Sequence, residues 1–393
     1  MNSKIQEMQK AILGEGLDGW LFCNYRHRDK LADELLGINP HTVNSRLWLY
    51  AVPSSGEALG ILHAIEPDSL GTGQSMLPGQ RVFYSSREEL LQKLSALTGK
   101  RWGIHYSDTI PAISYIDAGT ARMLEQAGLL TASAAPLIQR FKGLLNDDQI
   151  QSHLKAADHL YEIVETAWNR VRLSYNERTK LCEGDLRSLI RGEFSRRGLV
   201  CEHNPIVAAG INSANPHYDF NDDGALIKEN DIIQFDIWAK DSSPGGIYAD
   251  ISWLGVYSHT VPDWAAQAFE KLLCARDGAY CFIKNELNAG RRPSGEAVDR
   301  KTRALLCERG CGGALRHRTG HGIDTEVHGS GVNIDSVEFP DSRLLLEGSC
   351  FSLEPGIYFE NFGMRTEIDV YIKNGQPFIS GRDRQYTLLD CKG

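Results

Sequence analysis

The chain has 393 residues, of which 42 are Lys or Arg and 51 are Asp or Glu, so its formal net charge is −9 at pH 7. This acidic balance disfavours nucleic acid as a partner, because binding phosphates requires a basic face. No run of about 18 apolar residues is present, and we expect no membrane-spanning helix. The N-terminal stretch is interrupted by Lys4, Glu7, Lys10 and Glu15. It therefore does not resemble a signal peptide, and we expect a cytoplasmic protein.

The nine cysteines are an odd number and are spread along the chain. Disulfide frameworks are typical of small secreted domains. Cys307 and Cys311 lie close in sequence, but no second pair with the spacing of a zinc site accompanies them. We expect reduced, mostly buried thiols.

In the first part of the chain, strand-like and helix-like segments alternate. The pattern predicts strands at 18–25 and 46–52 and helices at 114–130 and 147–172. The polar stretch 139–148 between the two helices contains residues that suit a turn and a helix start. We place a domain boundary there, which gives domains of residues 1–142 and 143–393.

The second part differs because its predicted strands come in close pairs. Its helices are expected at 176–198, 262–284 and 294–309, and its strands at 231–239, 247–257, 349–354 and 367–373. Close pairing favours hairpins over repeated βαβ crossovers. The fold class is therefore α+β, with a largely antiparallel sheet in this domain.

Three motif-like patterns are discounted. Residues 14–19 match the letters G-x-G-x-x-G, but a helix precedes them and a strand follows, the reverse of a dinucleotide loop. Residues 219–224 imitate the start of a calcium loop, but position twelve is Asn230 instead of Glu. His317 and His321 have the spacing of a helical zinc site, yet Gly320 and Gly322 disfavour a helix, so only one of the two is expected to matter.

Four carboxylates and one imidazole stand out in apolar, strand-like segments: Asp236, Asp250, His321, Glu354 and Glu367. Each one alone has an ordinary alternative, such as a solvent-facing side chain or an ion pair with Arg. Together they are too much negative charge to bury unless cations neutralise it. Two divalent cations would do so, and the oxygen-rich set favours Mn²⁺, Co²⁺ or Fe²⁺ over a thiolate-type zinc site.

The segments around these residues resemble those of the pita-bread metallopeptidases, the family that includes prolidase, Xaa-Pro aminopeptidase, methionine aminopeptidase and the metal-free creatinase. The matching segments are PHY (216–218), the hairpin with Asp236 and Asp250, TGHGI (319–323), EVH (326–328), EPGIY (354–358) and GMRTEIDV (363–370). The resemblance implies a creatinase-like α/β domain at 1–142. It also implies a pita-bread catalytic domain at 143–393, with a curved, mostly antiparallel sheet covered by helices, and a homodimer.

The resemblance also implies roles for single residues. Asp236 would hold one metal, His321 and Glu354 the other, and Asp250 and Glu367 would bridge the two. A hydroxide shared by the cations would be the nucleophile, with Glu354 as general base. His217 and His328 would contact the substrate and stabilise the tetrahedral intermediate and the leaving group. Arg365 would clamp a substrate carboxylate or orient Glu367.

Four departures from the family pattern mark a divergent branch. Asp236 and Asp250 are 14 residues apart, three more than is usual, because residues 241–246 lengthen the turn. Trp238 stands where the family has Gly, and Gly329 stands where Glu is common. Ile247 replaces a frequent Tyr, with Tyr248 one step later.

These features predict a hydrolase with two divalent cations, Mn²⁺ as the first choice and Co²⁺, Fe²⁺ or Zn²⁺ as alternatives. Its expected substrate is a small peptide with proline in the second position, above all an Xaa-Pro dipeptide. The alternatives are an Xaa-Pro aminopeptidase for longer peptides, a non-catalytic binding module, and a hydrolase of another amide or of a phosphoester.

Overall fold

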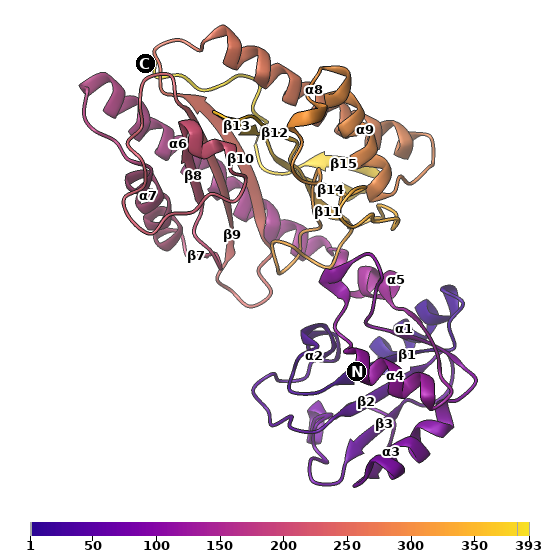
Figure 1. Cartoon of the computed structure of the whole chain (residues 1–393). Coiled ribbons are helices and arrows are strands. Elements are labelled where there is room, and N and C mark those ends of the chain that lie inside the picture. The colour runs from indigo at the N-terminus through magenta and orange to yellow at the C-terminus, as the bar shows by residue number, and fades with distance from the viewer. Residues whose placement is uncertain (1, 383, 393) are drawn as a thin grey trace. The chain divides into compact units, whose positions relative to one another are not determined.

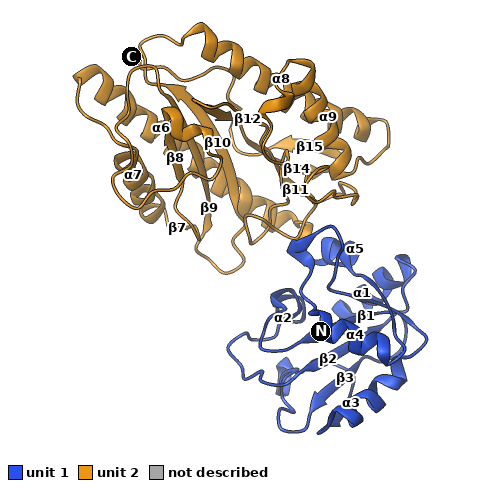
Figure 2. Ribbon diagram, in the orientation of Figure 1, with its two compact units in different colours: residues 1–142 blue, residues 143–393 orange. Residues whose placement is uncertain are grey.

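The structure, a computed structural model, describes residues 2–382 and 384–392 of the chain (Figure 1). The chain divides into two compact units, Met1–Lys142 and Gly143–Gly393 (Figure 2). Within the described residues, no helix is long and apolar enough to cross a membrane. All nine cysteines lie in the described part and are free thiols. The expectation that most of them are buried is wrong, because only Cys23, Cys311, Cys350 and Cys391 are buried.

Unit 1 is a six-stranded mixed sheet in the order β4-β3-β2-β1-β5-β6. Its strands are β1 (Gly19–Asn24), β2 (Trp48–Pro53), β3 (Leu59–His63), β4 (Gln80–Tyr84), β5 (Arg101–Ile104) and β6 (Leu130–Ser133). Its helices are α1 (Asn2–Gly14), α2 (Lys30–Leu36), α3 (Arg87–Leu94), α4 (Ala118–Gln126) and α5 (Ala135–Ile138). Trp20 and Phe22 of β1 pack with α1, α2 and α5 on one face, and Leu21 packs with α3 and α4 on the other. The expected α/β character of this half is confirmed.

Unit 2 is built from antiparallel strands and long helices. Its strands are β7 (Leu199–Val200), β8 (Ile206–Ala209), β9 (Ile232–Asp241), β10 (Ala249–Val256), β11 (Cys350–Leu353), β12 (Gly356–Tyr358), β13 (Gly363–Arg365), β14 (Ile368–Lys373) and β15 (Gln376–Ile379). Its helices are α6 (Asp147–Glu177), α7 (Glu183–Arg196), α8 (Asp263–Asn288) and α9 (Gly295–Glu308). All pairs among these strands are antiparallel, as predicted, and they form three sheets.

The β9–β10 hairpin separates a hydrophobic core from the candidate site. Its odd-numbered residues, such as Phe235, Ile237 and Ile251, pack against α6 and α7. Asp236 lies opposite Ser252, and Asp250 lies opposite Trp238, so these four side chains share the other face. The residues that lengthen the hairpin lie in the turn between Asp241 and Ala249, outside the paired strands. The longer spacing therefore leaves both aspartates on one face.

Several predicted boundaries are wrong. The helix predicted at 114–130 is only α4, because Asp117 caps its start and the chain enters β6 at Leu130. α6 continues to Glu177, where Arg178 ends it in the left-handed conformation, so the next helix begins at 183 instead of 176. The expected turn at 139–148 begins with a short π-helical segment, Gln139–Gly143, before the cap of α6 at Asn146.

The packing of α6 on the hairpin can be tested at Gly255, where an added Cβ would lie 2.0 Å from the ring of Trp168. Because the ring must move, we expect Gly255→Ala to lower the free energy of unfolding by about 1–3 kcal/mol, measured by urea denaturation. Gly192→Ala in α7 is the control, because a Cβ there meets nothing within 4 Å. We expect it to be neutral or stabilising. Equal midpoints for the two variants would contradict this packing.

Candidate metal centre

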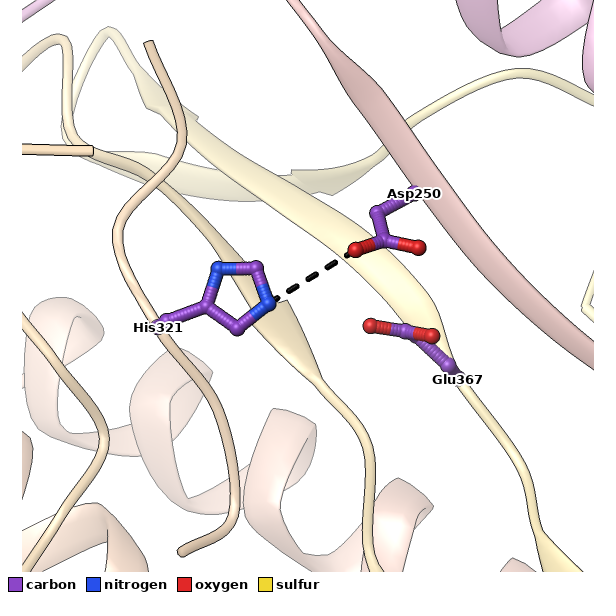
Figure 3. Close-up of side chains that lie close together, drawn as sticks. All are labelled: Asp250, His321 and Glu367. Carbon is purple, nitrogen blue, oxygen red and sulfur yellow. Dashed lines mark ion pairs between the residues drawn. The ribbon is translucent and has the colours of Figure 1, made fainter. Parts of the chain in front are cut away.

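Three of the predicted ligands converge from three separate segments of unit 2 (Figure 3). Asp250 comes from β10, His321 from the loop after α9, and Glu367 from the residue before β14. One ligand atom of each lies within 4.8 Å of the ligand atoms of the other two. All three residues are buried. The structure thus brings together residues that are far apart in the sequence.

Glu354 lies next to this group. Its Oε1 is 3.4 Å from His321 Nε2, which is itself 3.6 Å from Asp250 Oδ2. The Glu354 side chain is 14% exposed, whereas that of His321 is 3% exposed. Of the five predicted ligands, Glu354 therefore keeps the most contact with solvent, which suits a group that exchanges protons.

Asp236 lies beside the group and is held by other side chains. Arg365 Nη2 donates to its Oδ2, and Ser252 Oγ donates to its Oδ1 at 2.6 Å. Ser252 Oγ also lies 2.8 Å from Glu367 Oε2, so this hydroxyl links Asp236 to the converging ligands. Arg365 also donates to Ser252 Oγ and to Tyr358 OH. These contacts hold the guanidinium of Arg365 against Asp236.

Burial and mutual repulsion raise the pKa values of three of these carboxyl groups. Burial raises the pKa of Glu354 to about 7, an effect that Arg365 opposes and the charge of Asp236 reinforces. The pKa values of Asp250 and Glu367 are also raised, first by burial and then by neighbouring carboxylates. Arg365 alone does not compensate the negative charge of this cluster.

The donor set fits divalent cations. Asp250 Oδ1 is buried and has no hydrogen-bond partner, and the same holds for Oδ1 of the neighbouring Asp369. Among the described residues of unit 2, buried carboxylates elsewhere are satisfied: Asp335, for example, accepts from three backbone N–H groups of its own loop. An unsatisfied buried carboxylate is costly, and a hard cation with oxygen ligands removes that cost. Four carboxylates and one imidazole match this chemistry.

The glycines beside His321 allow a close approach of the backbone. A Cβ on Gly320 would lie 2.0 Å from the carbonyl oxygen of Ser352, and one on Gly322 would lie 2.6 Å from the backbone of Gly331. The His321 N–H donates to Ser352 Oγ at 3.1 Å. His321 is therefore fixed by tight backbone packing against the strand that leads to Glu354.

The two predicted substrate histidines differ in their surroundings. The ring of His328 packs edge-on against that of His321, with centroids 4.4 Å apart. His217 is exposed, and it is among the neighbouring groups that lower the pKa values of His317 and His328. The residue before it, Pro216, accepts a hydrogen bond from Arg365 Nη1 at 3.2 Å. Both histidines thus belong to the surroundings of the centre, His328 by direct contact with a predicted ligand.

Sequence reasoning missed several residues that support the centre. Ser252 could have been found, because it lies two residues after Asp250 on the same strand face. His317 was not predicted to take part in the site. In the structure its Nε2 lies 2.8 Å from Tyr358 OH, which also accepts a hydrogen bond from Arg365. Burial lowers the pKa of His317 to about 3, so it is neutral. Asp369 Oδ2 accepts the backbone N–H of Asp250 at 2.7 Å.

Of the residues that depart from the family pattern, Ile247 and Gly329 fit their surroundings, whereas nothing in the structure explains Trp238. Ile247 is buried, and the carbonyl oxygen of Tyr248 lies 2.6 Å from His153 Nδ1. A Cβ on Gly329 would lie 2.6 Å from the carboxylate carbon of Asp324. That carboxylate accepts the N–H of Ser330, so it fills the space beside residue 329.

Known proteins resemble this chain in sequence and in fold. Residues 153–374 match metallopeptidase family M24. A protein named "Probable dipeptidase PepE" from Mycobacterium tuberculosis is 26% identical over 363 residues, which cover 90% of this chain and 88% of that protein. An Xaa-Pro dipeptidase from Lactobacillus delbrueckii is 32% identical over 189 residues, 48% of this chain and 47% of that one. A prolidase structure from Thermococcus sibiricus covers 98% of both chains, with 24% identity and a TM-score of 0.66.

The family match spans more than half of the chain, and the solved prolidase shares its fold. The predicted resemblance is therefore confirmed: the chain belongs to metallopeptidase family M24 and has the pita-bread fold of that family.

Proposed function

We propose that this metallopeptidase hydrolyses the imide bond of Xaa-Pro dipeptides with the help of two divalent cations. The single observation that carries the proposal is the buried group of Asp250, His321 and Glu367, flanked by Glu354 and Asp236. Two relatives support the substrate class, one named as an Xaa-Pro dipeptidase and one as a dipeptidase. The imide nitrogen of proline carries no hydrogen, so peptidases that depend on that donor handle this bond poorly.

In this proposal, Asp236, Asp250, His321, Glu354 and Glu367 hold the cations, with Mn²⁺ as the first choice and Co²⁺, Fe²⁺ or Zn²⁺ as alternatives. When bound, the cations would make a water molecule acidic enough to act as a nucleophile at neutral pH. Asp236 is held in place by Arg365 and Ser252. The buried guanidinium thereby orients Asp236, where Glu367 was expected, and its contacts favour this role over the binding of a substrate carboxylate.

Glu354 is the proposed general base. Burial raises its pKa to about 7, and its side chain is partly exposed, so it can take a proton near neutral pH and release it to a leaving amine. His328, packed against His321, and His217, on the loop that contacts Arg365, are the proposed donors to the substrate oxygen and leaving group.

Dipeptide specificity is the first prediction from this proposal. With Mn²⁺ present, we expect kcat/KM for Ala-Pro to exceed that for Ala-Pro-Ala by about tenfold or more, measured by release of free alanine. Ala-Ala, which has an ordinary peptide bond, is the control and should be a poor substrate. Preference for Ala-Pro-Ala would instead support an Xaa-Pro aminopeptidase.

Metal binding should depend on pH. Because the pKa values of Glu354, Asp250 and Glu367 are raised, part of this set is protonated at pH 6 and must lose protons when a metal binds. We therefore expect Mn²⁺ affinity to increase from pH 6 to pH 8. Calorimetry in two buffers of different ionisation enthalpy measures the protons released. Equal affinity at both pH values, without proton release, would contradict the proposed ligand set.

The Asp250→Ala variant separates catalysis from mere binding. Since Asp250 would help to hold the cations, the variant should lose bound Mn²⁺ by elemental analysis and lose turnover together. Loss of metal with full turnover would contradict metal-dependent hydrolysis. Intact metal binding in the wild type without hydrolysis of any peptide would favour the binding module.

A homodimer and a cytoplasmic location complete the proposal. The dimer rests on the family resemblance and is checked by light scattering of the purified protein. The location is supported by the nine free thiols, which suit a reducing compartment.

A further inference from the structure

A single buried carboxylate holds the loop that carries His217. Glu183 lies in the first turn of α7 and is fully buried. The backbone N–H of Ala209 donates to its Oε1, and that of Ala225 donates to its Oε2, each at 2.7 Å. These two residues mark the beginning and the end of segment 209–225. Glu183 therefore ties together both ends of the loop.

Two side chains inside the loop bind the same carboxylate. Asn212 Nδ2 donates to Glu183 Oε1 at 3.0 Å, and Tyr218 OH donates to Oε2 at 2.9 Å. The pKa of Tyr218 is raised, first by burial and then by its hydrogen bond to Glu183, so the phenol keeps its proton and acts as the donor. Tyr218 follows His217 directly in the chain. The carboxylate thus fixes the position next to the proposed substrate histidine.

The backbone of the loop is also closely fitted to α7. The N–H of Gly184 donates to the Asp223 carbonyl at 2.8 Å, and a Cβ on Gly184 would lie 2.6 Å from that oxygen. Gly224 has a φ of +68°, and a Cβ there would lie 2.8 Å from Glu183 Oε2. A larger residue at either place would push the loop away from the carboxylate.

The other end of this arrangement reaches the metal centre. Arg365, which binds Asp236, donates to the carbonyl of Pro216. Ser213 Oγ accepts the N–H of Gly363 at 3.0 Å, which joins the loop to β13. The loop thus lies between α7 and the strand that carries Arg365. A displacement of the Glu183 side chain would therefore displace His217.

Capping of α7 does not explain this carboxylate. The helix start is capped by Asp185, whose Oδ2 accepts the N–H of Cys182 at 2.9 Å. Each of the four donors to Glu183 named above comes from the loop. Its hydrogen bonds therefore serve the loop, while Asp185 serves the helix.

We propose that Glu183 is a positioning residue for the reaction: it sets the place of His217 by holding segment 209–225 against α7. This inference rests on the proposed function, in which His217 contacts the substrate. The carboxylate is needed as such, because its two oxygens accept from backbone N–H groups at opposite ends of the loop.

The test is a double-mutant cycle with Glu183→Gln and His217→Ala, measured as kcat/KM for Ala-Pro with Mn²⁺. In Gln the amide nitrogen replaces an acceptor and would face an N–H donor, so the loop should shift. We expect Glu183→Gln to lower kcat/KM by about tenfold to a hundredfold, while bound Mn²⁺ stays at the wild-type amount. In the His217→Ala background the same change should cost less than about twofold.

Two further variants keep the test informative if Glu183→Gln folds poorly. Asp185→Asn is the matched control, because it alters the cap of the same helix without touching the loop, and kcat/KM should stay within about twofold of wild type. Tyr218→Phe removes one of the donors and should lower kcat/KM by a smaller factor than Glu183→Gln. Hydrogen–deuterium exchange of segment 209–225 should be faster in Glu183→Gln and Tyr218→Phe but unchanged in Asp185→Asn.

The outcomes are distinguishable. Full activity of His217→Ala would overturn the role of His217 in the proposed function, and with it this inference. An impaired His217→Ala together with an unimpaired Glu183→Gln would overturn the inference alone. An equal loss from Glu183→Gln in both backgrounds would also overturn it, because the effect would then not pass through His217.

Discussion

The mutual repulsion of buried carboxylates is the constraint around which unit 2 is organised. Asp250, Glu354 and Glu367 face one another with too few donors, and their pKa values are raised. Buried carboxylates elsewhere in the unit behave differently. Glu183 and Asp335 are each surrounded by N–H or O–H donors. The fold thus contains two kinds of buried acid: one is satisfied by donors of the protein, and the other, the proposed metal ligands, is not.

The scaffold that holds the unsatisfied group relies on packing at both faces of one hairpin. The face of β9 and β10 that carries the odd-numbered residues packs in the core with α6 and α7. The strands therefore cannot slip in register without exposing Phe235 and Ile237. That fixed register presents Asp236 and Asp250 side by side. On the opposite wall, Gly320 brings the His321 segment against β11 more closely than any other residue would allow. Rigid packing on both sides keeps the like charges together.

The family and the proposed ligands could be predicted from the sequence. The contacts that support those ligands could not, because they join residues far apart in the chain. An aspartate inside an apolar strand such as IIQFDIW is conspicuous. Short sequence motifs around such residues were enough to identify all five proposed ligands and the family. Residue-by-residue alternation would also have placed Ser252 beside them. No local pattern indicates that Arg365 pairs with Asp236, 129 positions away, or that Glu183 receives donors from segment 209–225. The predicted helix ends were wrong where one capping residue determines where the helix begins or ends, as Asp117 and Arg178 do.

The long turn of the β9–β10 hairpin also has a practical consequence. Residues 242–245 are exposed, Gly245 has a positive φ, and Asp241 braces the turn by accepting from Ser243. Pairing in both strands is complete before this tip is reached. The tip can therefore accept grafted peptide, such as an epitope or a fluorophore tag, while the aspartates below it keep their register. The chain thus offers an attachment point at the end of this hairpin that the core does not need.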